Sequence, residues 1–193
     1  MTVKDWSGNA NSIFKQLGAS SHSEEEREQN DYYATDPRAV FDLLKHEEFN
    51  HLIWEPASGG GHMVEALRSR GFKVRSSDLI NRGCQDELLN FLEYDTKIKW
   101  PGDIITNPPY KFCTEFILKA LDAVKEGAKV AMFLKLQTLE GQDRYNKLFK
   151  NAPPAQFMFM CAAYSALKMA SLKDQVRFVM LGSSGLRVLK ASQ

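Results

Sequence analysis

The chain has 193 residues with a net charge of +1, and 44% of its residues are hydrophobic while 25% are charged. This length and composition predict one soluble globular domain with a sizeable core. No run approaches the length of a membrane span, no secretory signal opens the chain, and the near-neutral charge means that any nucleic-acid-binding surface must be local.

The first segment, residues 1–30, is rich in Asn, Ser and Glu, which predicts a polar N-terminal arm. A helix is expected after it, because Thr35 or Asp36 can serve as N-cap, Pro37 suits the first turn, and apolar residues recur at positions 40, 43 and 44. The free amides and the positive dipole end at the start of this helix would suit a carboxylate ligand. The alternative is an ordinary helix cap.

A glycine-rich segment, Glu-Pro-Ala-Ser-Gly-Gly-Gly at 55–61, follows an apolar run at 52–54 that predicts a buried strand. A helix is expected over 62–70, with Gly71 at its end, because apolar residues recur there with helical spacing. Strand, glycine-rich loop and helix form the first unit of a doubly wound α/β fold, in which ligands bind beyond the carboxyl ends of the strands. The loop alone is weak evidence for a nucleoside cofactor.

Asp78 strengthens this interpretation, because it follows a second predicted strand at 72–76 and lies about twenty residues beyond the glycines. An acidic residue at this spacing can accept hydrogen bonds from both hydroxyls of a cofactor ribose. The loop lacks the complete G-x-G-x-x-G pattern and begins with Glu-Pro, so S-adenosylmethionine is favoured over a dinucleotide. A solvated turn residue is the alternative for Asp78.

The sequence Asn-Pro-Pro-Tyr at 107–110 follows a short apolar strand at 103–106. Its prolines lack N–H groups and end the strand, which leaves the Asn107 side chain and the Pro108 carbonyl as acceptors at a rigid strand end. Two acceptors can hold both protons of a planar exocyclic amine, such as N6 of adenine, and direct its lone pair at an electrophile. Tyr110 can then stack on the base. The alternative is an ordinary turn.

The rest of the chain continues the alternation, with a helix at 112–125, a buried strand at 129–136, a loop and helix at 138–149, and strands at 156–160 and 176–181. This pattern predicts an α/β fold with a mostly parallel sheet covered by helices on both faces. Three scattered cysteines, without metal-binding spacing, are typical of reduced thiols in a cytoplasmic protein. They are Cys84, Cys113 and Cys161.

Together these segments resemble the amino-methylating class of S-adenosylmethionine-dependent DNA methyltransferases, whose motifs are D/N-P-P-Y/F and E/D-P-x-x-G-x-G. Their order is similar to the gamma arrangement of that class. Residues 6–155 look like a compact phage- and prophage-borne group of adenine methyltransferases, which shares the segments at 6–9, 30–37 and 133–141. The resemblance implies a Rossmann-like class I methyltransferase fold, S-adenosylmethionine as cofactor and DNA as partner. One departure is Asp36, which separates Thr35 from Pro37.

The resemblance also implies roles for individual residues. The amine-binding and catalytic residues would be Asn107, Pro108, Pro109 and Tyr110. The class places one side chain beside the cofactor adenine, at Asn90 or Phe91 here, although a core position is the alternative. The cofactor-binding residues would be Thr35, Glu55, Pro56, Ala57, Gly59, Gly61, Asp78 and Phe91.

The same tetrapeptide serves enzymes that methylate RNA adenine, cytosine N4 or protein glutamine, because each of these presents a planar NH2 group. The protein-glutamine group usually carries a helical domain before its cofactor loop, and only a short polar-rich segment precedes Glu55 here. The sequence does not separate RNA from DNA. A catalytically impaired cofactor-binding module that acts through partners is the alternative from a different class.

An atypical tail at 161–193 follows the predicted methyltransferase domain at 31–160. Read in frame, it would supply the last strand. We favour a shifted reading frame, because the similar proteins carry Lys-Asn-Gly-Glu-Phe-Lys and later Ala-Trp-Phe-Val-Trp. One frame shift converts codons for these two sequences into residues 168–173 and 181–185. A frameshift predicts that the tail packs poorly, and the encoding DNA decides between the two readings.

Overall fold

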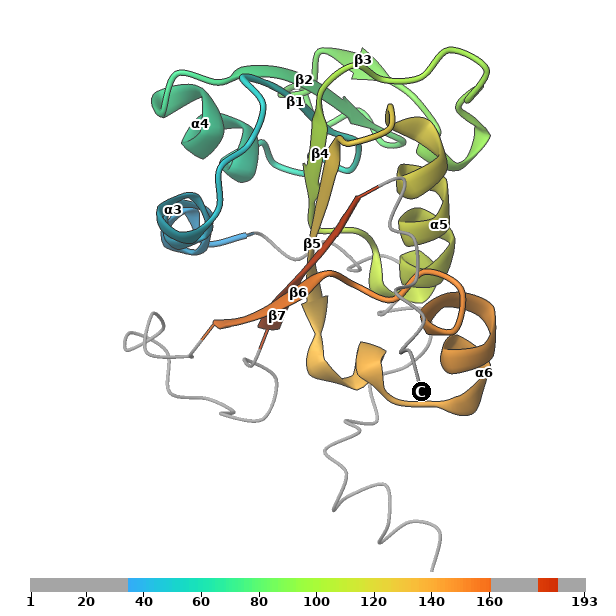
Figure 1. The fold of residues 1–193 in the computed structure, drawn as a ribbon. Coiled ribbons are helices and arrows are strands. Elements are labelled where there is room, and N and C mark those ends of the chain that lie inside the picture. The colour runs from blue at the N-terminus through green and yellow to red at the C-terminus, as the bar shows by residue number, and fades with distance from the viewer. Residues whose placement is uncertain (1–34, 161–176, 184–193) are drawn as a thin grey trace, which may run out of the picture. The chain divides into compact units, whose positions relative to one another are not determined.

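The centre of the structure, a computed structural model that describes residues 35–160 and 177–183, is a seven-stranded sheet in the order β3-β2-β1-β4-β5-β7-β6 (Figure 1). Neighbouring strands from β3 to β5 pair in parallel, whereas β7 is antiparallel to both β5 and β6. The strands are β1 (Leu52–Glu55), β2 (Lys73–Asp78), β3 (Glu87–Leu88), β4 (Asp103–Thr106), β5 (Lys129–Lys135), β6 (Gln156–Met160) and β7 (Arg177–Ser183).

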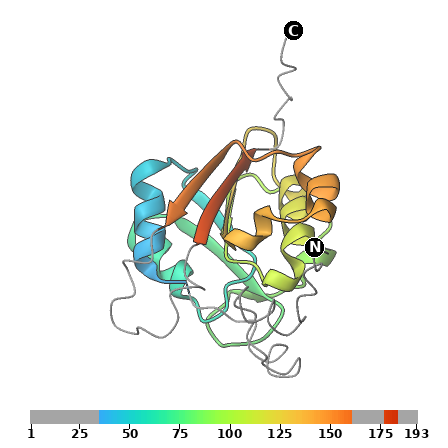
Figure 2. The same cartoon turned by 90° about the horizontal axis from the view of Figure 1, so that it is seen from below.

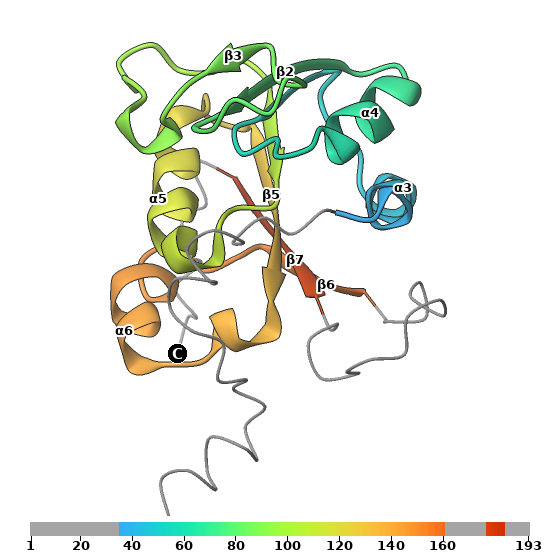
Figure 3. The ribbon, with the colours of Figure 1, turned by 180° about the vertical axis from the view of Figure 1, so that it is seen from behind.

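Helices cover both faces of this sheet. The helices α3 (Pro37–His46) and α4 (His62–Ser69) lie on one face, and α5 (Cys113–Ala123) lies on the other, with α6 (Gln142–Arg144) near its N-terminal end (Figures 1 and 3). The view from below shows the same two layers on either side of the strands (Figure 2). Short turns complete the connections: η1 (Phe91–Glu93), η2 (Tyr110–Phe112), η3 (Leu136–Leu139) and η4 (Tyr145–Phe149).

Alternation along the strands divides the core between the two faces, because successive side chains of a strand point in opposite directions. Ile53 packs with α3 and α4, whereas its neighbour Trp54 packs with α5. In the same way, Ile105 packs with α3 and α4, whereas Ile104 packs with α5. Each fully buried Leu, Ile or Phe side chain contributes about 1.5–3 kcal/mol to folding relative to an exposed one. Packing on both faces therefore stabilises the positions of the strands.

The helix starts follow from local sequence. Asp36 is the N-cap of α3, and its carboxylate accepts a hydrogen bond from the Arg38 backbone N–H at 2.9 Å. Pro37 occupies the first helical position, where its missing N–H costs nothing. The helix α4 begins after Gly61, and Gly71, just beyond its C-cap, has a φ of 87° that favours glycine.

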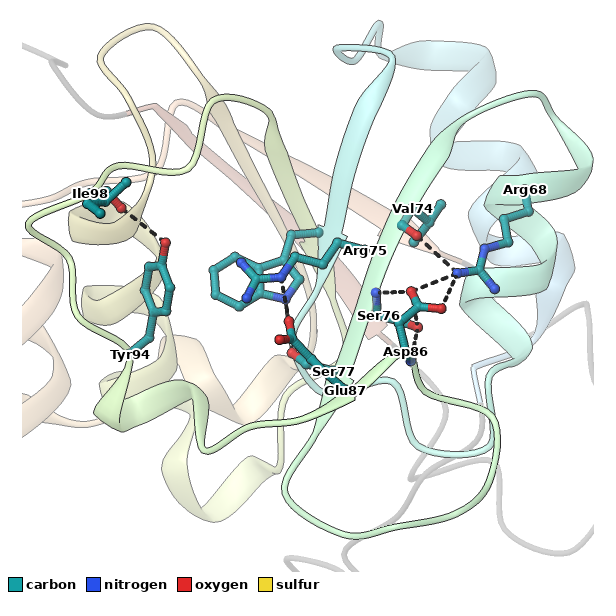
Figure 4. A network of polar contacts seen from close by, with 10 residues as sticks. Arg68, Val74, Arg75, Ser76, Ser77, Asp86, Glu87, Tyr94 and Ile98 are labelled. Atoms are coloured by element: carbon teal, nitrogen blue, oxygen red, sulfur yellow. Dashed lines mark hydrogen bonds and ion pairs between the residues drawn. The ribbon is translucent and has the colours of Figure 1, made fainter.

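Polar contacts hold β2 against its neighbours (Figure 4). Asp86 accepts hydrogen bonds from the backbone N–H and hydroxyl of Ser76, each at 2.8 Å, and from the Arg68 guanidinium at 2.8 Å. Although partial burial opposes it, these bonds lower the pKa of Asp86. On the other side of β2, the Arg75 guanidinium lies 4.1 Å above the Trp54 ring and pairs with Glu87. The middle of β2 is therefore fixed from both sides.

The predicted α/β fold is confirmed. The strands expected near 52–54, 72–76, 103–106 and 129–136 are β1, β2, β4 and β5, and the last two expected strands are β6 and β7. The short strand β3 was not anticipated. Residues 1–34, 161–176 and 184–193, which include the predicted arm and most of the tail, lie outside the described residues, so the reading frame of the tail stays a prediction. Within the described ranges, no helix is long and apolar enough to cross a membrane.

Candidate active site

The predicted site residues gather at one edge of the sheet, where four parallel strands end side by side. In the order β2-β1-β4-β5, the last residues of these strands are Asp78, Glu55, Thr106 and Lys135. The glycine-rich loop leaves β1 at this edge, and the Asn-Pro-Pro-Tyr sequence leaves β4 next to it. In open α/β sheets, ligands bind at such an edge where the strand order reverses, which here lies between β1 and β4.

The glycine-rich loop is held by two hydrogen bonds to the end of β2 and by one to the connection that follows β2. The Gly59 backbone N–H donates to Asp78 Oδ2 at 2.7 Å, and the Ser58 N–H donates to the Ser77 carbonyl at 3.0 Å. The Cys84 thiol donates to the Gly59 carbonyl at 3.0 Å. The loop is thus preformed and is bonded to Asp78, while the contact of Asp78 with a cofactor ribose stays a prediction.

Gly61 shows how closely the loop is packed. Its φ of 79° favours glycine, and a Cβ at this position would lie 3.2 Å from Cys84 Cβ. Pro56 is buried and Ala57 is half-buried, and both belong to the turn between β1 and the glycines. The second oxygen of Asp78, Oδ1, accepts the Ile80 N–H at 2.9 Å, so the carboxylate is held in one orientation.

Glu55 is the most deeply buried charged group of the site, with 1% of its surface exposed. Thr106 Oγ1 donates to Glu55 Oε1 at 2.6 Å. Burial raises the pKa of Glu55 well above its usual value; the Thr106 hydroxyl and the nearby amides of Ala57 and Asn107 oppose this rise, and Asp78 adds to it. Removal from water therefore disfavours the ionised form of Glu55, and a nearby cation would favour it.

Two buried oxygens of the loop have no hydrogen bond of good geometry within the described part of the chain, namely Glu55 Oε2 and Ser58 Oγ. Buried polar atoms are rarely left in this state, because an unmade hydrogen bond costs about 1–3 kcal/mol. A ligand with hydrogen-bond donors would satisfy both atoms.

Asn107 is connected to the start of α3. Its side-chain Nδ2 donates to Thr35 Oγ1 at 3.1 Å, and Thr35 is 7% exposed. The sequence placed Thr35 with the cofactor; the structure brings its hydroxyl to the amide of Asn107, and a cofactor contact stays a prediction. Asp36 pairs with the Arg38 side chain, with one N–O distance of 2.6 Å, so the helix start already carries an anion.

The remaining residues of the Asn-Pro-Pro-Tyr sequence lie beside the end of β5. Pro108 is buried, and Pro109 leads into the turn η2 that carries Tyr110. Lys135 Nζ lies 4.5 Å from the centroid of the Tyr110 ring. Sequence reasoning had not assigned Lys135 a role. Lys135 ends the strand that pairs with β4, and this position could have indicated that it lies at the site.

Phe91 lies in the core. It is 2% exposed, and its ring centroid is 5.1 Å from that of Trp54 and 5.2 Å from that of Phe116. Asn90 caps η1, because its Oδ1 accepts the Leu92 N–H at 3.2 Å. A contact between Phe91 and a cofactor adenine stays a prediction.

No family model matches the chain, and no curated protein matches its sequence. Solved structures do match the fold. One is a Listeria monocytogenes protein assigned to the class I S-adenosylmethionine-dependent methyltransferases, with a TM-score of 0.59 and 12% identity over 92% of this chain and 67% of that one.

Two further structures match at a TM-score of 0.52. The Burkholderia thailandensis 1,6-didemethyltoxoflavin-N1-methyltransferase, solved with its substrate and S-adenosylhomocysteine, is 9% identical over 93% of this chain and 92% of that one. An rRNA methyltransferase from Streptomyces viridochromogenes is 10% identical over 80% of this chain and 87% of that one. The chain has the Rossmann-like class I methyltransferase fold. At these identities, the fold is what the similarity shows.

Proposed function

We propose that this protein transfers a methyl group from S-adenosylmethionine to the N6 amine of adenine in DNA. The observation that carries the proposal is the hydrogen bond from Thr106 to Glu55, because it joins the two halves of the site. Glu55 ends β1 and opens the glycine-rich loop, whereas Thr106 ends β4 and immediately precedes Asn107. A cofactor on the loop and an amine at Asn107 would therefore be neighbours.

The residues of the β1–β2 edge fit S-adenosylmethionine. Asp78 can accept hydrogen bonds from ribose hydroxyls, and the buried Glu55 Oε2 and Ser58 Oγ need hydrogen-bond donors, which an ammonium group would supply. When bound, this cofactor supplies an activated methyl group on a sulfonium, which an amine nitrogen takes with loss of one proton and release of S-adenosylhomocysteine. Glu55 would ionise beside the incoming positive charge.

The chain's own part in the reaction is to hold the amine. Asn107 Oδ1 and the Pro108 carbonyl would accept the two amine protons, and Tyr110 would stack on the base. Lys135 lies against the Tyr110 ring and would keep it in place. No covalent intermediate is required, so alignment and electrostatic stabilisation account for catalysis.

DNA adenine as the substrate rests on the resemblance of the Asn-Pro-Pro-Tyr segment and its neighbours to the phage-borne adenine methyltransferases. Structures with the same fold include an rRNA methyltransferase, a tRNA methyltransferase from M. jannaschii and the 1,6-didemethyltoxoflavin-N1-methyltransferase, so the fold is compatible with a nucleic-acid substrate without selecting it. This chain spans 50% of the tRNA enzyme.

Mass spectrometry of nucleosides tests the proposal. The purified protein is incubated with S-adenosylmethionine carrying a trideuterated methyl group and with DNA, or with RNA of the same sequence. The expected product is labelled N6-methyladenine in the DNA, absent with the Asn107→Ala variant. Label in RNA or in cytosine would reassign the substrate. No label, together with cofactor binding seen by calorimetry, would support the non-catalytic module.

A further inference from the structure

The segment between β5 and β6 lies beside the candidate site and has no role in the proposed reaction. It follows Lys135, whose Nζ contacts the Tyr110 ring, and runs through η3, α6 and η4 (Figures 1 and 3). A specific protein–DNA complex buries about 1,000–2,500 Å² of protein surface, which is much more than a pocket for one base. DNA that delivers an adenine to Asn107 would therefore also cover surface next to the site.

The η3–η4 segment, residues 136–150, is held in a fixed shape. The Arg144 guanidinium donates to the carbonyls of Gln137 and Glu140, at 2.6 and 2.8 Å, and so closes the connection on itself. Leu148 is fully buried in the core layer that packs with α5. Because a preorganised surface loses less entropy when it binds a partner, the segment is suited to recognition.

Exposed lysines and aromatic rings occur together on this segment and on the neighbouring turn η2. Lys147 and Lys150 are exposed, and within the part of the chain that the structure describes neither ammonium has an ion-pair partner. The two acidic residues of the segment precede position 144, so its last turns carry only positive charge. Tyr145 is 56% exposed, and Phe112 in η2 is 43% exposed. Lysines bind the phosphates of a nucleic acid, and exposed rings stack on its bases.

The basic side chains beside the cofactor half of the site are already engaged in ion pairs. Arg68 pairs with Asp86, and Arg75 pairs with Glu87. Since the chain has a net charge of only +1, a surface that binds phosphates has to be local. The end of the η3–η4 segment meets this requirement.

We propose that the η3–η4 segment contacts DNA beside the target adenine, with Lys147 and Lys150 against phosphates and Tyr145 stacked on a neighbouring base. The inference rests on the proposed function, which places the target adenine at Asn107. Extrusion of a base breaks stacking in the duplex, and an aromatic ring of the protein can replace the lost contact. Of the Phe, Tyr and Trp side chains that the structure describes, Tyr145 is the most exposed.

The two kinds of contact differ in how they respond to salt. Each phosphate that a lysine neutralises contributes about 0.9 to the slope of log affinity against log salt concentration, because counterions are released from the DNA. Stacking releases no counterions, so it adds affinity without changing this slope.

Fluorescence anisotropy with the full chain measures both quantities. The probe is a labelled DNA duplex with one adenine opposite an abasic site, so that the adenine is already unpaired. We expect Lys147→Gln combined with Lys150→Gln to lower the slope by about 1.8. The matched control combines Lys73→Gln, at the start of β2, with Lys97→Gln, in the connection that leads to β4, and should keep the wild-type slope. An unchanged slope in the first pair, or equal losses in both pairs, would overturn the inference.

The stacking contact is tested with the same probe. Tyr145→Ala should lower the affinity about 5- to 100-fold, the range of one base stacked on an aromatic ring, and leave the slope unchanged. Tyr145→Phe keeps the ring and should bind like the wild type. Wild-type affinity in Tyr145→Ala, or an equal loss in Tyr145→Phe, would overturn the stacking contact.

These outcomes also separate the inference from the proposed function. If the wild type methylates no adenine but its binding to DNA depends on Lys147, Lys150 and Tyr145, the proposed function fails and the surface stands. If DNA is methylated and the variants bind like the wild type, the inference is overturned and the proposed function stands. Dependence on the same side chains for an RNA duplex, without binding of the DNA probe, would overturn DNA as the partner of this surface.

Discussion

The two halves of the site are built in different ways. In the β1–β2 half, the glycine-rich loop is held by bonds within one compact segment, from Gly59 to Asp78 and Cys84. In the β4–β5 half, the side chains proposed to bind the substrate contact residues from distant segments. Asn107 contacts Thr35, and Tyr110 contacts Lys135. Substitutions in the first half should therefore change cofactor affinity, whereas those in the second half should change turnover.

The largest effect is expected from Asn107→Ala, which removes one of the two amine acceptors. By analogy with the loss of an oxyanion-hole donor, the cost should be about 2–4 kcal/mol of transition-state stabilisation, or roughly 30- to 1,000-fold in kcat. Affinity for S-adenosylmethionine should be retained, because the loop is not touched. Steady-state kinetics and calorimetry measure the two quantities.

A matched control for this variant is Asn50→Ala, which removes another asparagine side chain, near the amino end of β1. Asn50 Oδ1 accepts the Leu52 N–H at 3.0 Å, so its loss should affect stability alone. Wild-type turnover in Asn107→Ala would refute the amine-binding role of the motif.

In the β1–β2 half, Asp78→Ala should weaken cofactor affinity. The carboxylate accepts the backbone N–H groups of Gly59 and Ile80, at 2.7 and 2.9 Å, and would bind the ribose hydroxyls. Hydrogen bonds to a charged group contribute about 1.5–3 kcal/mol, so the dissociation constant of S-adenosylmethionine should rise roughly 10- to 100-fold. Calorimetric titration measures it.

The comparison variant for Asp78 is Asp86→Ala, at the other end of the connection between β2 and β3. Asp86 bonds to Ser76 and Arg68 instead of the glycine-rich loop. The Asp86→Ala variant should therefore have a lower free energy of unfolding, with little change in its affinity for the cofactor. Equal affinity losses in both variants would mean that Asp78 acts through folding and has no direct role in binding.

A smaller effect is expected from alanine substitutions at two glycines, which separate the cost of backbone strain from the cost of close packing. Gly61 and Gly71 both have positive φ angles, 79° and 87°, but only a Cβ at Gly61 meets another atom within 4 Å, namely Cys84 Cβ at 3.2 Å. Gly71→Ala should cost about 1–2 kcal/mol through backbone strain alone. Gly61→Ala should cost more and should also weaken cofactor binding. Urea unfolding measures the free energy of unfolding of both variants. Identical losses would show that Cys84 moves aside without cost when a Cβ is added at Gly61.

Local sequence was sufficient for the strands, the glycine-rich loop and the prolines that end β4, because these depend on periodicity and on backbone chemistry. The spacing that placed Asp78 after β2 was also sufficient, since it reflects one βα unit. The contacts of Thr35 with Asn107 and of Lys135 with Tyr110 were not predictable, because they depend on how α3 and β5 pack beside β4. Phe91 shows the same limit, since an apolar run does not say which of its members faces the core.

The smallest change is expected from Glu55→Gln, which alters a single ionisable group within the β1–β2 half. Burial raises the pKa of Glu55 well above its usual value of 4.5. As the pH rises above 4.5, the unfolded chain loses this proton while the folded protein keeps it, so folding takes up a proton and stability falls until the folded pKa is passed. Glutamine has no such proton. Urea unfolding between pH 4 and pH 8 should therefore show Glu55→Gln gaining stability over the wild type as pH rises, while its affinity for S-adenosylmethionine decreases. The exposed Glu126→Gln is the control and should follow the wild type. Parallel curves for all three proteins would mean that Glu55 is already ionised in the folded protein without a ligand.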